Sequence, residues 1–266
     1  MRNISVVIPI YNEEEILSAT VEGLIRKLKT GHGKGIEVIL VDNGSTDRTP
    51  EILSLLSEKF SWIKVVKYPY PDFGEAVRLG IRRASKPFVL LLNADWWEES
   101  FFNQAYEKRF EFDIIVGSKE LESGLDKRPL IRKVGTHFLT VITKALFGYK
   151  GKDTHGLKLM NTRRVLPLID KCTTHEILET ELMVRAQKEN LRICEIPCPV
   201  REIRKARVSF ARRCIRNLVE LALLYRQLQG AKLVLYSRRA WNGFISSLIL
   251  DLHQPWWGLK YFLRSF

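Results

Sequence analysis

The first half of the chain alternates short runs of β-branched residues with longer stretches whose apolar positions recur at helical spacing. This alternation is typical of a parallel sheet whose strands are joined by crossover helices. It predicts four strands in the first hundred residues, at Ile4–Pro9, Glu37–Val41, Ile63–Val66 and Phe88–Leu92. We therefore expect an α/β fold with a mostly parallel sheet flanked by helices.

Three helices are predicted between these strands. Glu13–Lys29 has apolar residues at helical spacing and three glutamates in its expected first turn, where the helix dipole favours negative charge. Pro50 stands at a first helical position and opens a helix that runs to Lys59. The third helix is expected from Gly74 to Ala84.

The second half continues the alternation and then becomes wholly helical. Further strands are predicted at Asp113–Ser118, Gly156–Asn161 and Arg192–Pro197, and further helices at Leu130–Phe147 and His175–Asn190. From about Val208 onward the pattern is helical, with breaks at Gly230, Gly243 and Pro255.

Charge and composition change near residue 200. The whole chain of 266 residues has a net charge of +13, but residues 201–266 hold 13 Lys and Arg against 3 Asp and Glu, a net of +10. We expect a catalytic domain over 1–200 and a basic helical extension over 201–266. Such a basic segment indicates a nucleic acid, an anionic lipid surface or a phosphorylated substrate as its partner.

Aromatic residues in the extension favour the lipid surface. Trp and Tyr stand beside Lys and Arg on short apolar stretches, as in helices that lie in a membrane interface: Trp241, Trp256, Trp257 and Tyr261. A helical cap on the catalytic domain or a dimer contact is the alternative. We expect no nucleic-acid partner, because the basic run itself lacks the interleaved aromatic residues that stack on bases. No apolar run is long enough to span a bilayer, so peripheral attachment is expected.

Cysteine usage points to a reducing compartment. The four cysteines are too few and too unevenly spaced for a disulfide framework, and the chain shows no secretory leader, so a cytoplasmic location is expected. Cys194 and Cys198 could serve as two metal ligands, but a second pair of ligands is missing. A structural role for both is the favoured interpretation.

Polar residues follow three of the predicted strands. Pro9 to Glu13 comes after the first strand, Asp42 to Asp47 after the second, and Asn93 to Asp95 after the fourth. Ligands of open parallel sheets bind at the carboxyl ends of the strands. One such segment alone would be an ordinary turn, but three in order predict a binding site.

These segments resemble the family 2 glycosyltransferases of the GT-A fold, which begin VVIPxYNEE, continue VDDGSxDxT and then carry Asp-x-Asp. Later segments look like those of dolichyl-phosphate mannose and glucose synthases: Arg132-Lys133, Asp153 to Lys158, Glu181-Leu182 and Glu195 to Pro197. The similarity covers roughly residues 4 to 210. It implies an enzyme that moves a hexose from a GDP- or UDP-sugar to a polyprenyl phosphate at the cytoplasmic face of a membrane, with inversion.

The resemblance also implies the donor site. Four residues are expected to line the pocket of the nucleotide base: Pro9, Tyr11, Glu13 and Asp42. A carboxylate can accept the imide hydrogen of a base, which an apolar wall cannot. The alternative for Tyr11 and Glu13 is a packed ring and a glutamate that serves the helix dipole.

The Asp-x-Asp segment departs from the family pattern, because Asn93 replaces the first aspartate. Mg²⁺ or Mn²⁺ is the expected cofactor, with Asp95 as the principal metal ligand. Asn93 is expected to contribute an amide oxygen to the same metal and to line the site of the nucleotide-sugar donor, with weaker metal binding than an aspartate would give. A non-catalytic nucleotide-sugar-binding protein is the alternative that this replacement leaves open.

Cations are expected to hold the phosphates. By resemblance, Lys119 and Arg132 contact the leaving diphosphate or the acceptor phosphate, and Arg204 with Ser209 is the best spacing match to the acceptor-phosphate pair of relatives. Preplaced cations stabilise charge that develops on a leaving group. A solvated surface charge is the alternative for Lys119 and Arg132.

The acceptor decides whether a protein base is needed. A hydroxyl must lose a proton, whereas a lipid phosphate is already anionic near pH 7, since its second pKa is about 6. Glu181 occupies the region where hydroxyl-directed relatives place a catalytic aspartate, so transfer to a hydroxyl-bearing glycan or lipid is the runner-up. Asp153 is expected to order the loop that ends at Gly156.

Overall fold

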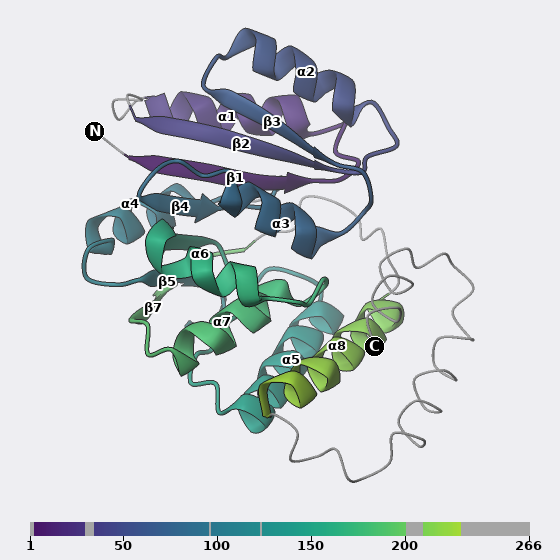
Figure 1. Ribbon diagram of the computed structural model, residues 1–266, viewed down its shortest axis with the longest axis vertical. Helices are drawn as coiled ribbons and strands as arrows, with labels where there is room; N and C mark the ends of the chain where they lie inside the picture. Colours follow the sequence, from purple (N-terminus) through teal and green to yellow (C-terminus); the bar gives the residue numbers. More distant parts are fainter. Residues whose placement is uncertain (1–2, 30–34, 96, 123, 201–209, 230–266) are drawn as a thin grey trace.

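The computed structural model describes residues 3–29, 35–95, 97–122, 124–200 and 210–229, which form a seven-stranded sheet covered by helices (Figure 1). The strand order is β3-β2-β1-β4-β6-β5-β7. All neighbouring strands are parallel except β6, which is antiparallel to both β4 and β5. The mostly parallel α/β sheet predicted from the sequence is confirmed.

The strands agree closely with the apolar runs that predicted them. Their bounds are β1 Ile4–Ile10, β2 Ile36–Asn43, β3 Ile63–Tyr68, β4 Phe88–Leu91, β5 Ile114–Ser118, β6 Lys158–Asn161 and β7 Ile193–Pro197. Every residue of β2, β4 and β5 is buried, as expected for strands that helices cover on both faces.

Helices cover both faces of the sheet. The helices are α1 Leu17–Lys29, α2 Thr49–Lys59, α3 Phe73–Arg82, α4 Glu99–Lys108, α5 Leu130–Phe147, α6 Thr162–Lys171, α7 Leu178–Lys188 and α8 Phe210–Gln229. One apolar core joins α1, α2 and α4 to the sheet, and a second joins α3, α6 and α7 to its other face. Alternate residues of β1 supply the two cores, with Val6 in the first and Val7 in the second.

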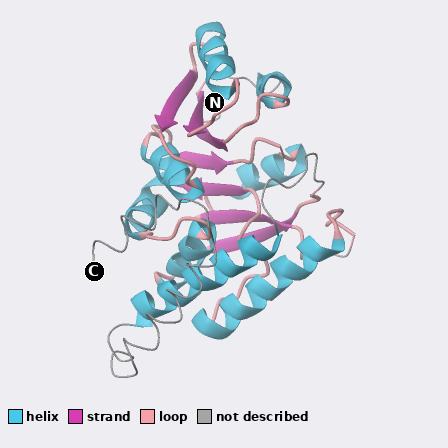
Figure 2. Cartoon of the chain, turned by 90° about the vertical axis from the view of Figure 1, so that its right-hand side faces the viewer, coloured by secondary structure: helices cyan, strands magenta, loops and turns pink. Residues whose placement is uncertain are grey.

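A third apolar cluster lies away from the sheet. It joins α5, α7 and α8 through Leu139, Phe147, Val184, Leu221 and Leu224. Both views place α5 and α8 side by side at the lower end of the domain (Figure 1, Figure 2). The last described helix is thus packed on the domain through its apolar side.

Some elements differ from the prediction. The helix predicted from Glu13 begins at Leu17, so its three glutamates precede the helix instead of forming its first turn. The backbone amides of Glu13 and Glu14 are instead held by Thr49 at the start of α2 and by Asp47 in the loop before it. Helices α4 and α6 had not been predicted, and α6 contains Pro167, a residue that usually argues against a helix.

In the part of the chain that the structure describes, no helix is long and apolar enough to cross a membrane. The aromatic residues of the predicted interface segment, Trp241, Trp256, Trp257 and Tyr261, lie outside the described residues.

Candidate active site

The three polar segments after β1, β2 and β4 meet at one edge of the sheet, because these strands are neighbours and parallel. Two further segments reach this edge. β5 is parallel to β7 and ends here at Ser118, while the antiparallel β6 begins here, with Lys158 opposite both Leu91 and Val116. The loop from Asp153 to Leu157 therefore enters the sheet beside the donor segments.

The loops after β1 and β2 are joined by reciprocal hydrogen bonds. The Asn12 amide nitrogen donates to Ser45 Oγ at 3.0 Å, and the Thr46 amide donates back to Asn12 Oδ1 at 2.7 Å. The Glu13 amide donates to Thr49 Oγ1 at 2.8 Å, which extends this contact into the start of α2. The joined loops fix the backbone on either side of Tyr11 and Glu13.

Asn12 adopts the left-handed backbone conformation, with a φ of +53°. Asn tolerates this conformation better than other non-glycine residues, because its short polar side chain bonds locally. Here the side chain also contacts the neighbouring loop. Asn12 is a site residue that the sequence analysis missed, although an Asn at a strand end is a usable signal for such a turn.

Asp42, predicted to bind the base, is buried at the end of β2. Its Oδ1 accepts a hydrogen bond from the Ser45 amide at 3.1 Å, across a turn that Gly44 makes with a φ of +71°. A Cβ on Gly44 would lie 2.7 Å from the backbone of Tyr70, so a side chain is excluded there. Glu13 is also buried, which agrees with a fixed position for both predicted base ligands.

The predicted metal ligands Asn93 and Asp95 follow β4 and are partly exposed. They offer an amide and a carboxylate oxygen, which are hard donors that suit Mg²⁺ or Mn²⁺. Within the described ranges, no three His, Cys, Asp or Glu side chains gather as a metal-binding group. Two such donors would need water and substrate phosphate oxygens to complete the shell of a bound metal, and their assignment as ligands stays a prediction.

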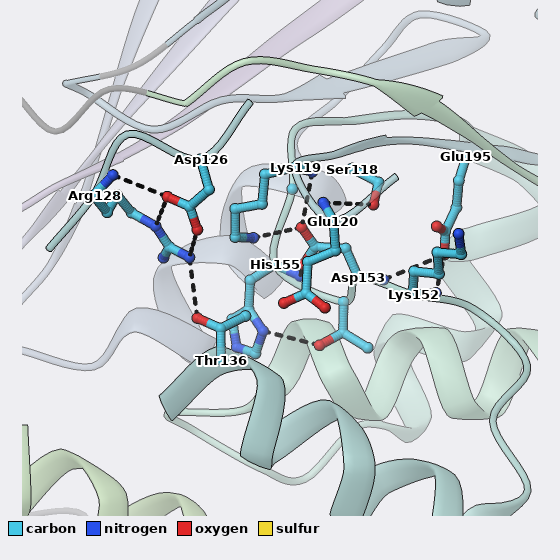
Figure 3. A network of polar contacts seen from close by, with 12 residues as sticks. Ser118, Lys119, Glu120, Asp126, Arg128, Thr136, Lys152, Asp153, His155 and Glu195 are labelled. Carbon is cyan, nitrogen blue, oxygen red and sulfur yellow. Dashed lines mark hydrogen bonds and ion pairs between the residues drawn. The ribbon is translucent and has the colours of Figure 1, made fainter. Parts of the chain in front are cut away.

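Lys119 lies in a buried polar network at the end of β5 (Figure 3). Its ammonium group pairs with Asp153, whose side chain is fully buried. Burial would raise the pKa of Asp153, but the charge and hydrogen bond of Lys119 hold that pKa at about 2. The alternative interpretation of Lys119 as a solvated surface charge is wrong, because its side chain is buried. Its contact with phosphate stays a prediction.

Asp153 orders its loop, as predicted. Its Oδ1 accepts a hydrogen bond from the His155 amide at 2.9 Å, and the Glu195 carboxylate of β7 accepts one from the Lys152 amide at 2.6 Å (Figure 3). The loop ends at Gly156, where a Cβ would lie 1.8 Å from the carbonyl oxygen of Gly117. Only glycine fits this close approach of two backbones.

A second buried pair lies beside the first. Lys158 is fully buried, and its Nζ lies 3.1 Å from Glu179 Oε2 and donates to the Gly156 carbonyl at 2.8 Å. Burial and the charges of Lys158 and Lys119 lower the pKa of His155 to about 3, so that ring is neutral at pH 7. Sequence reasoning missed both charges of this pair.

Of the other residues predicted to bind phosphate, the structure describes Arg132 only. Arg132 lies in the first turn of α5 and is partly buried, and its amide donates to the Pro129 carbonyl at 2.9 Å. Arg204 and Ser209 lie outside the described residues. The assignment of all three to phosphates stays a prediction.

Glu181, the alternative catalytic carboxylate, is fully buried. Its Oε2 accepts hydrogen bonds from the amides of Thr173 and Thr174, and its Oε1 lies 2.7 Å from Arg185. A carboxylate held in this way positions the loop before α7. A general base has to contact the acceptor hydroxyl, whereas the Glu181 side chain has no solvent exposure.

The cysteines agree with the structural interpretation. All four are free thiols, and Cys172 and Cys198 are buried. Burial raises the pKa of Cys198 to about 12, which keeps this thiol protonated.

Comparison with known proteins agrees with this geometry. Residues 5–118, which hold the three donor segments, match the glycosyl transferase family 2. The chain carries a family 2 glycosyltransferase domain. The predicted resemblance to this enzyme family is thereby confirmed for residues 5–118.

Curated relatives extend the similarity beyond that domain. Dolichyl-phosphate beta-glucosyltransferase ALG5D of Trichomonas vaginalis is 29% identical over 246 residues, which are 84% of this chain and 74% of that protein. Dolichyl-phosphate beta-glucosyltransferase of Saccharomyces cerevisiae is 27% identical over 251 residues, 83% of this chain and 73% of that protein.

A solved structure shares the fold. Glucosyl-3-phosphoglycerate synthase of Mycobacterium tuberculosis, crystallised with Mg²⁺ and uridine diphosphate, aligns with a TM-score of 0.60 at 19% identity. The alignment covers 82% of this chain and 79% of that chain. The GT-A fold predicted for the glycosyltransferase is confirmed.

Proposed function

We propose that this glycosyltransferase moves a hexose from a UDP- or GDP-sugar to a polyprenyl phosphate, by one inverting displacement at the cytoplasmic face of a membrane. Residues 1–200 form the catalytic part in this proposal, and residues 201–266 form the extension that meets the membrane. The observation that carries it is the gathering of the donor segments at one sheet edge, next to a buried network of lysines.

The names of the relatives support the acceptor and the sugar. The two curated relatives described above are dolichyl-phosphate glucosyltransferases, and each aligns with more than four-fifths of this chain. A glucosyl donor is accordingly the first to test. The uridine diphosphate in the mycobacterial structure favours UDP over GDP as the carrier.

The donor segments have distinct tasks in this proposal. Tyr11, Glu13 and Asp42 hold the base, and the joined loops fix their backbone. Asp95 and Asn93 hold Mg²⁺ or Mn²⁺, which when bound stabilises the negative charge of the departing diphosphate. Lys119 and Arg132 add positive charge on the side of the loop between β5 and α5.

The ionisation of the acceptor favours a phosphate over a hydroxyl. A phosphate monoester carries its nucleophilic oxygen as an anion near pH 7, so the transfer needs no proton acceptor from the protein. Glu181 is the residue considered as a general base for a hydroxyl. Its carboxylate already accepts hydrogen bonds from two backbone amides and pairs with Arg185. This arrangement supports direct attack by the lipid phosphate.

A transfer assay tests the proposal. Labelled UDP-glucose, GDP-glucose, UDP-galactose and GDP-mannose are each supplied to the full chain with Mg²⁺ or Mn²⁺ and a polyprenyl phosphate, a polyprenol or an oligosaccharide. We expect metal-dependent transfer to the polyprenyl phosphate alone. Transfer to the polyprenol or the oligosaccharide would favour a hydroxyl acceptor, and nucleotide-sugar binding without turnover with any acceptor would contradict an enzymatic role.

A further inference from the structure

Helix α5 exposes a row of large apolar side chains. Val134, Phe138 and Val141 are 58%, 52% and 47% exposed, and Leu130 and Ile131 at the start of the helix are 75% and 56% exposed. These positions recur at three- and four-residue spacing, so they lie along one side of the helix. A monomeric soluble protein rarely leaves such a continuous apolar strip in water.

The opposite side of α5 is already used for packing. Leu139, Thr140, Thr143 and Phe147 are buried, and the apolar ones join the cluster shared with α7 and α8. At 100° per residue, these buried positions point away from the row of Val134, Phe138 and Val141. The exposed row is therefore a second apolar face, which the fold of the domain does not require.

The charges on α5 itself are basic, and Glu120 lies at the border of the row, with its Oε2 3.8 Å from His137 Nδ1. The sequence of α5 contains no Asp or Glu, whereas Lys133 and Lys144 fall on one border of the apolar row. The adjoining helix α8 adds Arg213 and Arg226, while its Arg216 pairs with Glu176 at 2.9 Å. Its single acidic residue, Glu220, accepts hydrogen bonds from the backbone amides of residues 175–177. An apolar strip bordered by lysines complements a surface that is apolar within and anionic at its rim.

We propose that the exposed face of α5, made of Leu130, Ile131, Val134, Phe138 and Val141, lies in the headgroup region of an anionic bilayer. The apolar row enters the boundary of the acyl chains, and Lys133 and Lys144 remain among the headgroup phosphates. The residues of this contact all belong to the described domain.

The position of the face suits the acceptor, and this step rests on the proposed function. Arg132, predicted to hold the acceptor phosphate, lies in the first turn of the same helix. The loop that precedes α5 joins it to β5 and Lys119 at the site edge, and Thr136 of α5 bonds Arg128 in that loop (Figure 3). A bilayer against α5 therefore brings lipid phosphates to the entrance of the catalytic edge without lifting the lipid out of the membrane.

The test compares two matched double variants of the full chain. Val134→Gln with Phe138→Gln changes the exposed row, and Leu55→Gln with Phe110→Gln makes the same kind of change at exposed residues elsewhere. Binding to vesicles of phosphatidylcholine with phosphatidylglycerol is measured by co-sedimentation. Because each lost side chain removes apolar burial, we expect ~10-fold weaker binding or more for the α5 variant and no change for the control.

Two further measurements separate the possible failures. Transfer to a water-soluble short-chain polyprenyl phosphate should be unchanged in the α5 variant, while transfer to a long-chain acceptor in vesicles should fall with vesicle binding. Vesicle binding equal to wild type would overturn the inference, as would a wild-type dimer that the variant converts to monomers without a loss of vesicle binding. Absence of transfer to any polyprenyl phosphate would defeat the proposed function, and the vesicle comparison would still decide the role of α5.

Discussion

Asn12 combines a left-handed backbone with a side chain that bonds the neighbouring loop. We predict that Asn12→Gly, which keeps the backbone free of strain, raises the KM for the donor severalfold with little change in kcat. Asn12→Ala should raise it further, since an alanine in this conformation costs ~1–2 kcal/mol. Steady-state kinetics with a varied donor concentration measures both effects.

The control for this prediction is Asn190, which has the same conformation, with a φ of +56°, between α7 and β7. Asn190→Ala should lower the free energy of unfolding and leave the donor KM unchanged. If the two asparagine variants change the donor KM equally, Asn12 has no positioning role.

Asp95 and Asn93 test the metal assignment. Asp95→Ala should abolish metal-dependent turnover, because the single carboxylate of the triplet is lost, whereas Asn93→Asp should tighten metal binding by adding a second one. Calorimetric titration with Mn²⁺ in the presence of the nucleoside diphosphate reports the affinity. Near-normal metal-dependent turnover of Asp95→Ala would show that the ion is held elsewhere.

Glu181 is expected to matter for stability and not for chemistry. Glu181→Gln weakens the contacts with two amides and Arg185 in a fully buried place, so the free energy of unfolding should fall by about 1–3 kcal/mol. Turnover per folded molecule at 25 °C should stay within a few-fold of wild type. A loss of ~100-fold in kcat for a fully folded variant would instead identify Glu181 as a general base.

At the scale of elements, the junction of α3, α7 and α8 depends on side chains that end or begin helices. Glu220 of α8 accepts hydrogen bonds from the amides of His175, Glu176 and Ile177, just before α7 begins. Glu220 thus holds the segment that leads into α7, including its N-cap residue Ile177. Docking of α8 and the start of α7 are therefore coupled.

The His175 ring bonds Asp72, the residue that caps α3, and this junction should respond to pH. The hydrogen bond to Asp72 raises the pKa of His175 above 6.5 in the folded chain, so the ion pair stabilises the fold fully below that pH. We expect this stabilisation to be lost as the pH rises through the raised pKa. Denaturant unfolding at a series of pH values should show a fall above pH ~6.5 that is smaller in His175→Gln.

That comparison isolates the histidine, because burial also raises the pKa of Glu220 and adds its own pH dependence in both proteins. Parallel curves for wild type and His175→Gln would mean that the pair with Asp72 contributes nothing to the pH response.

At the scale of the whole molecule, we predict two components of membrane attachment. Removal of residues 231–266 should weaken binding to anionic vesicles and leave nucleotide affinity unchanged, because the donor segments lie in the first hundred residues. Salt should weaken the charged component, since exposed charges are screened over roughly 8 Å at physiological ionic strength. The apolar component should persist at high salt, and co-sedimentation at low and high salt measures both.

Contrary results are easy to distinguish. Full-length protein that ignores anionic vesicles at every salt concentration would contradict the membrane role of the extension. Loss of nucleotide affinity on truncation would show that the basic segment is part of the donor site.

Most of the sheet and the donor edge could be predicted from the sequence, because they depend on local signals. The period of apolar residues located every strand, and α5 was predicted at its observed bounds, Leu130–Phe147. The three polar segments pointed to one edge because parallel strands end on the same side. Pro50 marked the start of α2, which begins one residue earlier at Thr49.

What the sequence by itself determined is therefore the strands, most of the helices and the chemistry placed at the strand ends. Only the tertiary structure decided which distant side chains meet. Lys119 and Asp153 are 34 positions apart, and His175 and Glu220 are 45 apart, so no local pattern relates them. The direction of β6 and the apolar face left open on α5 were also decided there. The physical reason is that periodicity reports which side of an element is apolar, whereas the partner that covers it depends on how the whole chain packs.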